Sequence, residues 1–272
     1  TSSDETNILA CLVAKRLGAK STIARVRNPE YLRQTEIMKE DLGLTMIVNP
    51  EQETADEIVN LIDLPSLLKV EHFARGKVML VEILVEENSK LIDETLITLA
   101  KKINTKFLIC AVQRGNEVII PNGNFKIEKG DRISVTADTQ LIAELLKEMN
   151  LISEPLKNIL IIGGGKIAYY LAKTLISKKY KVKLIENNEE RAVELAESLP
   201  KATIICGDGT DHDLLVEEGI ETTDSCIALT NIDEENIIIS MYAKKLKLPK
   251  VIAKIKRSSF LGMLNDLGIV NA

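Results

Sequence analysis

The hydrophobic pattern of residues 151–272 switches period several times. Short apolar runs, such as NILIIG, KVKLIE and ATIICG, alternate with segments in which apolar residues recur every three or four positions, such as KIAYYLAKTLISKK and EERAVELAESL. DSCIALT and KVIAKIK continue the series of strands. Short buried strands separated by helices are typical of a parallel sheet with helices on both faces. The pattern therefore predicts a doubly wound, Rossmann-like α/β unit over 151–272.

Residues 67–150 follow another order. VMLVEILV is strand-like, IDETLITLAKKI is helical, and FLICAVQRGNEVIIP is a hairpin that turns at Arg114-Gly115-Asn116. DRISVTAD is a further strand, and TQLIAELLKEMN closes the block as a helix. This order predicts a small α+β module with an antiparallel sheet. It holds no glycine-rich loop and no group of acids and bases, so we predict no catalytic site in it.

Residues 1–66 open with Asp4-Glu5 and an amphipathic helix, for which no strand precedes in the sequence. A strand TIARVR, a helix YLRQTEIMKEDLG, a strand TMIVN and a helix ADEIVNLIDL follow, and Pro65 breaks the pattern. This is the order expected for the back half of an α/β unit.

The first 32 residues repeat later in the chain. When residues 1–32 are aligned without a gap to residues 230–261, helix, loop and strand stay in register. The identical pairs are Thr1/Thr230, Asp4/Asp233, Glu5/Glu234, Asn7/Asn236, Ile8/Ile237, Ala14/Ala243, Lys15/Lys244, Leu17/Leu246, Ile23/Ile252, Ala24/Ala253 and Leu32/Leu261. We infer an internal duplication. The first copy lacks the strands in front of its helix and the second lacks a continuation, so we expect a fragment that is truncated at both ends.

Composition narrows the function classes. The chain has 272 residues, of which 45% are hydrophobic and 28% charged, and its net charge is -5. A near-neutral chain predicts no nucleic-acid partner, and no apolar run is long enough to cross a bilayer. The four cysteines are scattered in apolar segments, which favours a reduced, cytosolic setting. His72 and His212 have no metal-ligand spacing, so we predict no metal site.

The chemically informative segment is ILIIGGGKIAYYLAKTL. Gly163, Gly165 and Ala168 fit G-x-G-x-x-G/A directly after a strand and at the start of a helix, where backbone N–H groups bind a pyrophosphate. Glu186 ends the next strand, 21 residues after Gly165, where an acid accepts hydrogen bonds from ribose hydroxyls. Asn187 follows it instead of an arginine, which favours NAD or another adenine nucleotide over NADP.

Two further residues, Lys166 and Asp208, have two interpretations each. Lys166 opposes the helix dipole unless it pairs with a bound phosphate, and a solvated lysine is the alternative. Asp208, in CGDGTD after the third strand, accepts from the nucleoside or else caps the helix that begins near Thr210. Thr230-Asn231 end the fourth strand at the same edge of the sheet. A glycine turn that serves only close packing is the alternative for the whole loop.

Together, GGGKIAYYLA, the acid at the second strand end, CGDGTD, ALTNIDEEN and ARVRNPEY resemble the TrkA family. Its members are regulatory subunits of Trk-type potassium uptake systems, built from RCK (KTN) domains. The resemblance implies a first RCK N-subdomain, reduced to its back half, over 1–66. It also implies an RCK C-subdomain over 67–150 and a second, Rossmann-like N-subdomain over 151–272.

The resemblance implies regulation and not catalysis. The ligand would be NAD(H) or ATP/ADP, and the intact chain would pair its repeats and form a tetrameric ring. That ring would lie in the cytoplasm, peripheral to the inner face of the cell membrane, and gate a Trk-type potassium transporter subunit. Arg25 and Lys254 occupy the strand position where the family often places a base near phosphates. The candidate nucleotide-binding residues are Gly163, Gly164, Gly165, Lys166, Ile167, Glu186, Asn187, Arg191, Gly207, Asp208, Thr210, Thr230, Asn231 and Lys254.

Two other functions fit parts of the pattern. A nicotinamide-dependent oxidoreductase would need an acid/base at the nicotinamide end, whereas His212 lies at the expected adenosine end. A structural adaptor with a vestigial nucleotide pocket needs only the fold. Lack of turnover excludes the first alternative, and nucleotide binding excludes the second.

Overall fold

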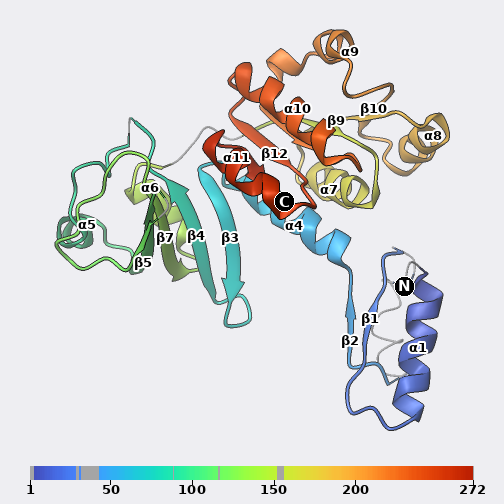
Figure 1. Ribbon diagram of the computed structural model, residues 1–272, viewed down its shortest axis with the longest axis horizontal. Helices are drawn as coiled ribbons and strands as arrows, with labels where there is room; N and C mark the ends of the chain where they lie inside the picture. The colour runs from blue at the N-terminus through green and yellow to red at the C-terminus, as the bar shows by residue number, and fades with distance from the viewer. Residues whose placement is uncertain are drawn as a thin grey trace.

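The computed structural model describes residues 3–28, 31, 43–87, 89–115, 117–151 and 156–271, with the side chains of 265, 266 and 271 left out (Figure 1). The helix predicted over YLRQTEIMKEDLG falls almost wholly outside these residues.

A six-stranded parallel sheet forms the last part of the chain. Its strands are β8 (Asn158–Ile162), β9 (Lys181–Glu186), β10 (Thr203–Cys206), β11 (Ser225–Ala228), β12 (Lys250–Ala253) and β13 (Val270–Asn271). They lie in the order β10-β9-β8-β11-β12-β13, and every neighbouring pair is parallel. The order reverses between β8 and β11, which is the signature of a doubly wound fold. The predicted fold class is confirmed.

Helices cover both faces of this sheet. Ile161 of β8 lies in one core with Leu171, and its neighbour Ile162 lies in another with Leu215, because successive side chains of a strand point to opposite faces. The first face carries α7 (Lys166–Ser177) and α8 (Glu189–Ser198), and the second carries α9 (His212–Glu217), α10 (Asp233–Lys245) and α11 (Leu261–Asp266). Two short 3-10 turns, Ile220–Thr222 and Ser258–Phe260, connect elements of this unit.

The middle of the chain forms a five-stranded antiparallel sheet. Its strands are β3 (Leu67–Phe73), β4 (Val78–Leu84), β5 (Phe107–Arg114), β6 (Glu117–Ile119) and β7 (Arg132–Asp138), in the order β3-β4-β7-β5-β6. The helices α5 (Leu96–Lys102) and α6 (Ile142–Glu148) complete the module. The α+β architecture was predicted, but β3 was missed. Only Leu67 and Val70 of β3 are buried, and its register shifts between Leu67 and Lys69, so its sequence lacks the two-residue period of a half-buried strand.

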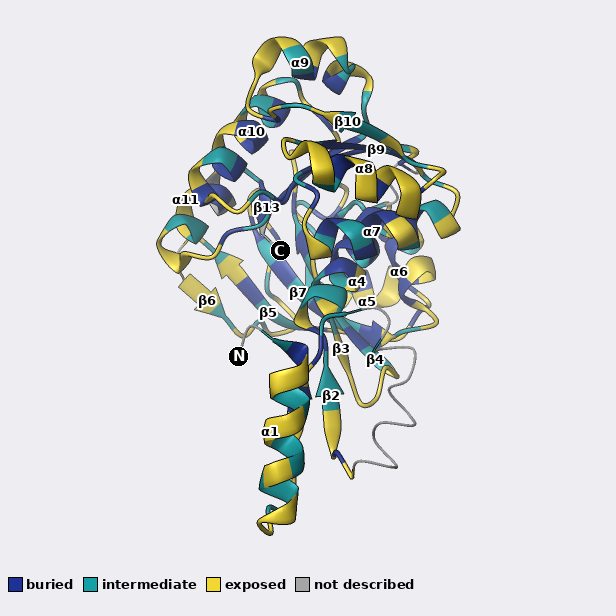
Figure 2. Ribbon diagram, turned by 90° about the vertical axis from the view of Figure 1, so that its right-hand side faces the viewer, coloured by how far each residue is buried: buried dark blue, intermediate teal, exposed yellow. Residues whose placement is uncertain are grey.

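The first part of the chain holds α1 (Asp4–Arg16), β1 (Ile23–Arg25), β2 (Met46–Val48) and α4 (Pro50–Asp63). The N-terminal cap of α1 is Ser3, whose hydroxyl accepts the Thr6 N–H at 3.1 Å. β1 and β2 pair in parallel over a small core. The outer side of this unit leaves Leu17 and Ile23 exposed, and Figure 2 shows α1 projecting from the rest of the molecule.

Helix α4 begins at the end of this first unit and packs on α7, in the unit with the six-stranded sheet. Its buried residues share one core with Leu171 and Leu175 of α7. At its end, Asp63 accepts a hydrogen bond from the Tyr180 hydroxyl at 2.7 Å and forms an ion pair with Lys178. The division of the chain at 66 and 150, made from the sequence, stays a prediction.

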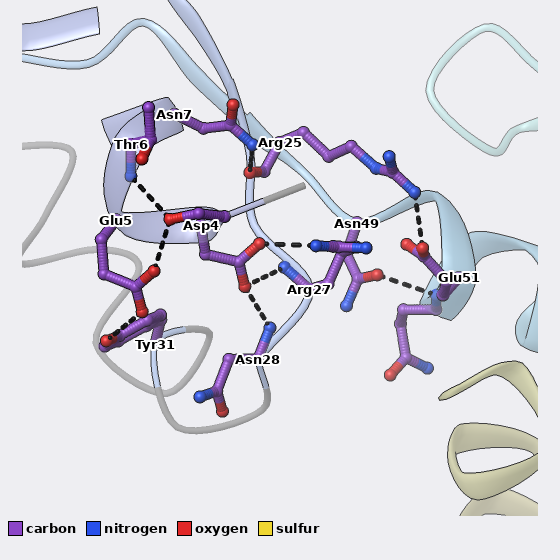
Figure 3. Close-up of polar contacts among 12 residues, drawn as sticks. Asp4, Glu5, Thr6, Asn7, Arg25, Arg27, Asn28, Tyr31, Asn49 and Glu51 are labelled. Atoms are coloured by element: carbon purple, nitrogen blue, oxygen red, sulfur yellow. Dashed lines mark hydrogen bonds and ion pairs between the residues drawn. The ribbon is translucent and has the colours of Figure 1, made fainter. Parts of the chain in front are cut away.

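The duplicated segments share their polar contacts as well as their sequence. Asp4 Oδ2 accepts the backbone N–H groups of Arg27 and of the next residue, both at 2.8 Å (Figure 3). Asp233 accepts those of Lys256, at 3.1 Å, and of the residue after it, at 3.0 Å. In both copies a buried acid at the start of a helix therefore holds the chain that follows the neighbouring strand.

A pair of asparagines repeats the same way. Asn7 Nδ2 donates to the carbonyl of Arg25 at 3.0 Å, and Asn236 Nδ2 donates to the carbonyl of Lys254 at 2.8 Å. Each amide ties its helix to the end of β1 or β12. The internal repeat is thus a repeat of hydrogen bonds as well as of residue types.

Candidate nucleotide-binding site

The carboxyl ends of β8, β9, β10 and β11 surround a cavity of about 210 Å³. It lies where the strand order reverses, which is where open α/β sheets bind ligands. The predicted site residues that line it are Gly163, Gly164, Gly165, Glu186, Asn187, Gly207, Asp208, Thr210, Thr230 and Asn231. Segments predicted from four separate strand ends therefore come together in one hollow.

The three glycines of the loop differ in what a side chain would meet. Gly163 has φ +98°, and a Cβ there would lie 2.9 Å from the backbone after β11. At Gly164 a Cβ would lie 2.7 Å from the Glu186 carboxylate. At Gly165 it would meet nothing within 4 Å. The first two glycines allow the loop to form, and the third leaves open space where a ligand can approach the backbone.

Gly165 is the N-cap of α7, and no side chain caps that end of the helix. Uncapped N–H groups and the helix dipole together attract an anion. Lys166 is exposed and Ile167 half-buried, and neither is among the residues that line the cavity.

The charge of Lys166 acts on the first unit of the chain. The pKa of the Glu5 carboxyl is lowered by the hydroxyl of Ser3 first, and also by that of Tyr31, which donates to Glu5 (Figure 3). The charge of Lys166 makes a smaller contribution in the same direction. The start of α1 therefore lies within electrostatic reach of the glycine loop.

The Glu186 carboxylate accepts hydrogen bonds from two backbone N–H groups. Its Oε2 accepts the Gly164 N–H at 2.5 Å, and its Oε1 accepts the Asn188 N–H at 2.9 Å. A carboxylate has about four lone-pair positions, so room is left for ribose hydroxyls. The side chain of Arg191 supports the loop from behind, since its Nε donates to the Gly164 carbonyl at 2.9 Å. Arg191 does not line the cavity.

Asp208 forms a turn of its own. Its Oδ1 accepts the N–H of Thr210 at 2.8 Å and the hydroxyl of the same residue at 2.7 Å, and these bonds lower the pKa of the carboxyl. The interpretation of Asp208 as a helix cap is wrong, because α9 begins at His212 and its N-cap is Asp211. The Asp208 side chain shapes the cavity wall instead.

The loop after β11 is held from within the helix that follows it. Asn236 Oδ1 accepts the Thr230 N–H at 2.9 Å, and the Thr230 hydroxyl donates to the Ile232 carbonyl at 3.1 Å. These bonds position Thr230 and Asn231 at the cavity.

Lys254 and Arg25, the two equivalent basic residues, have different partners. Lys254 does not line the cavity, but its Nζ donates to the carbonyl of Leu229, a lining residue, at 3.2 Å. Burial, and then the neighbouring Lys256, lower the pKa of Lys254. Arg25 forms an ion pair with Glu51 of α4 at 2.5 Å.

The sequence analysis missed an acid in the cavity wall. Glu235, in the first turn of α10, lines the cavity beside Glu186 and Asp208. It stands in an acidic run, Asp233-Glu234-Glu235, which resembles an ordinary helix start, so no sequence signal distinguished it. The described part of the cavity wall therefore contains three carboxylates.

The described residues can be compared with what a metal site and a membrane span require. Within them, no three His, Cys, Asp or Glu side chains are grouped so that they could hold a metal ion. No described helix has the length and apolar character to span a bilayer. His212 is exposed and its ring contacts that of Tyr242, with 4.7 Å between the ring centres.

Comparison with known families matches both halves of the architecture. The TrkA-N domain matches residues 1–50 and 159–272, which contain the two copies of the repeat, and the TrkA-C domain matches residues 80–150. The chain belongs to the TrkA family. TrkA-N is a nucleotide-binding domain, and the resemblance seen in the sequence is confirmed.

Curated relatives agree over nearly the whole chain. A Trk system potassium uptake protein TrkA homolog of Archaeoglobus fulgidus is 34% identical over 270 residues, covering 99% of this chain and 61% of the relative. TrkA homolog 1 of Methanosarcina mazei is 36% identical over 278 residues, covering 99% and 68%. TrkA of Vibrio alginolyticus is 36% identical over 277 residues, covering 100% and 60%. This TrkA-family chain thus spans about three fifths to two thirds of these proteins.

Solved structures show the same fold. The GsuK channel aligns with a TM-score of 0.69 at 19% identity, covering 99% of this chain and 47% of that one. The GsuK RCK domain aligns with a TM-score of 0.66, covering 99% and 57%, again at 19% identity. The relatives are named for potassium uptake and the structures for RCK domains and channels, in agreement with the prediction that the chain is not an enzyme.

Proposed function

We propose that this TrkA-family chain belongs to a regulatory subunit that senses an adenine nucleotide and thereby controls potassium uptake. The observation that supports the proposal best is the Gly163–Gly165 loop. It opens α7 and forms one wall of the cavity at the reversal point of the sheet. The names of the curated relatives support the link to potassium.

The ligand we propose is NAD(H), ATP or ADP, which share adenosine and a diphosphate. In this proposal Gly165 and the uncapped start of α7, with Lys166, hold the phosphates, while Glu186 holds the ribose. Asp208 and Thr210 lie at the adenosine end. Two GsuK structures of the same fold are described as bound to NAD and to ADP. A bound nucleotide would supply charge and hydrogen-bonding groups that act on both repeats.

The intact protein, in this proposal, pairs its repeats and forms a tetrameric ring in the cytoplasm. The ring would dock on the inner face of the cell membrane against a Trk-type transporter subunit and convert nucleotide binding into gating. The human SLO3 gating ring is among the structures of this fold, with a TM-score of 0.52 and 15% identity. The alignment covers 98% of this chain and 61% of that one. It supports the proposal of a ring.

One observation favours a second candidate, an adaptor with a vestigial pocket. Glu186, Asp208 and Glu235 line the cavity, and the described lining contains no cation to offset them. Such a wall disfavours phosphate unless the ligand's charge stays at the α7 end.

Calorimetric titration with NADH and ATP separates the two candidates. We expect the chain to bind, and Gly165→Val to weaken binding by about tenfold or more, because the new side chain fills the open space beside the loop. The substitution is compatible with the backbone, which is extended there, with φ -66° and ψ -175°. Lys181→Ala, an exposed position at the other end of β9, is the control. No nucleotide binding at millimolar concentration by the wild-type chain would establish the adaptor.

A further inference from the structure

A second, larger cavity of about 550 Å³ lies between the five-stranded and the six-stranded sheet. Its walls include the Pro65-Ser66 junction between α4 and β3, the end of β4, and the start of β12. In a parallel sheet the start of β12 lies at the edge opposite the carboxyl ends, so this cavity is remote from the nucleotide-binding cavity. Its volume is within the range of about 300–1,000 Å³ that is typical of small-molecule sites.

A buried lysine stands in its wall. Lys250, the first residue of β12, is 4% exposed, and its Nζ donates to the carbonyl of Pro65 at 3.1 Å and to that of Leu67. Among the described residues, no carboxylate pairs with it. An ammonium group has three N–H donors, and a buried charge is costly without an opposite charge. The two carbonyls satisfy part of its hydrogen-bonding capacity and none of its charge.

A second lysine approaches the same cavity from α10. Lys244 is half-buried, and the structure gives it no hydrogen bond within the described ranges. Burial lowers the pKa of Lys244, while the carboxylate of Glu86 acts in the opposite direction. Burial, and then the charge of Lys244, lower the pKa of Lys250 to about 7. Two like charges that share one cavity are unfavourable when it is empty and favourable around an anion.

We propose that this cavity binds a small phosphate-bearing anion, inorganic phosphate or a phosphomonoester, between the ammonium groups of Lys244 and Lys250. A phosphate dianion fits two lysines better than a singly charged carboxylate would, because each ammonium group binds phosphate as a point charge. Ser89 and Asn150 line the same cavity and add neutral hydrogen-bonding groups. Glu86 is exposed and contributes one negative charge to the described lining. When both lysines are protonated, the net charge of this lining is therefore positive.

A bound anion that also contacted Ser89 or Asn150, which come from the middle module, would join the two sheets. Lys250 already holds the carbonyls at the α4–β3 junction, and the anion would add Lys244 of α10 to the same cluster. This inference goes beyond the proposed nucleotide function and does not depend on it.

The direct test is calorimetric titration of the whole chain with inorganic phosphate. Lys244→Met should weaken binding by about ten- to a hundredfold, since a charged hydrogen-bonding partner is lost. Lys250→Met should do the same, but it also leaves two carbonyls without their donor, so Lys244→Met is the decisive variant. Lys245→Met, an exposed neighbour in the same helix, should bind as the wild type does. Absence of binding at millimolar phosphate, or equal binding by Lys244→Met and Lys245→Met, would overturn the proposal.

The pH dependence gives a second readout. Sulfate is the probe, because its charge is constant near neutral pH. The titratable side chains among the described lining residues are Glu86, Lys244 and Lys250. Sulfate affinity should fall as the pH rises through about 7, because Lys250 loses its proton there, and Lys250→Met should abolish this change. A pH-independent affinity of the wild type would count against the role of Lys250.

Two further arms identify the source of the anion and separate the two sites. Glycerol 3-phosphate, which lacks adenine, should bind more tightly than inorganic phosphate if the cavity takes phosphomonoesters, and equally or less tightly if it takes the free ion. Gly165→Val should leave phosphate binding here unchanged. If it removes phosphate binding, the anion sits at the glycine loop and the present proposal is wrong.

Discussion

The carboxylate of Glu186 accepts the backbone N–H of Gly164 at 2.5 Å. The acid at the end of β9 therefore helps to hold the loop that follows β8, as well as facing the cavity. A residue that would hold ribose also supports the neighbouring phosphate-binding loop. Substitution of Glu186 should consequently affect both the ligand and the empty protein.

Glu186→Ala should weaken NAD and ATP binding alike by about ten- to a hundredfold, because the adenosine ribose is common to both. It should also lower the free energy of unfolding by about 1–3 kcal/mol, since the N–H groups of Gly164 and Asn188 lose their acceptor. Calorimetry and urea unfolding measure the two effects. Lys166→Ala is the comparison: its loss should affect ATP more than NAD and matter less at high salt. An unchanged nucleotide affinity in Glu186→Ala would refute the ribose assignment.

Gly163→Ala and Gly165→Ala should separate folding from binding. Gly163 has φ +98°, and a Cβ added there would lie 2.9 Å from backbone atoms, so alanine at this position should cost about 2–4 kcal/mol of stability. Gly165 has open space around it, so alanine there should change stability by less than about 0.5 kcal/mol. Urea unfolding of both variants gives the measurement. Equal stability of the two would contradict the loop geometry.

Asp4 and Asp233 should make stability depend on acidic pH. Burial alone would raise the pKa of each, but hydrogen bonds from two backbone N–H groups and an arginine bring the pKa below its ordinary value. Stabilisation from a carboxyl with a lowered pKa is complete above the unfolded value of 3.8 and is lost as the pH falls below it. Asp233→Asn should lower stability at neutral pH by about 1–2 kcal/mol.

The measurement is urea unfolding across the acidic range. The wild type should lose stability more steeply below about pH 4 than Asp233→Asn does. Glu221→Gln, exposed and remote from this contact, should follow the wild type. Parallel curves for Asp233→Asn and the wild type would mean that the Asp233 carboxylate contributes no pH-dependent stability.

The contact of α4 with the second unit should be measurable through Asp63. Burial raises the pKa of Tyr180, and the hydrogen bond to Asp63 raises it further. Asp63→Ala should cost about 1–2 kcal/mol, whereas Glu53→Ala, exposed on the same helix, should cost less than about 0.5 kcal/mol. A double-mutant cycle with Tyr180→Phe should give a coupling of about 1 kcal/mol. A coupling near zero would mean that the hydrogen bond does not stabilise the contact.

The parallel sheet was predictable because its central strands, β8, β11 and β12, are buried on both faces and its strands stand out as apolar runs between helices. β8 and α7 gave the strongest pattern, and the glycine loop between them was placed correctly. β3 was missed because polar residues interrupt its apolar ones and a register shift breaks its period. Local sequence identifies a strand when burial is regular along it, on one face or on both.

The candidate site divides in a similar way. Residues at strand ends, such as Glu186 and Asp208, were found because topology alone brings strand ends together. The directions of long side chains could not be found this way. Arg191 donates to the Gly164 carbonyl and Lys254 to the Leu229 carbonyl, although the family resemblance placed Lys254 near the phosphates and Arg191 was among the candidate nucleotide-binding residues. Glu235 gave no signal, since acids are common in a first helical turn.

Helix α4 follows the first copy of the repeat in the sequence and lies against α7, in the unit that contains the second copy. Had the two repeats been separate polypeptides, this contact would form only by encounter and would weaken on dilution. Within one chain the linker sets a high effective concentration, so the pairing is independent of how much protein the cell makes. Duplication followed by fusion thus turns an association equilibrium into a fixed property of each molecule.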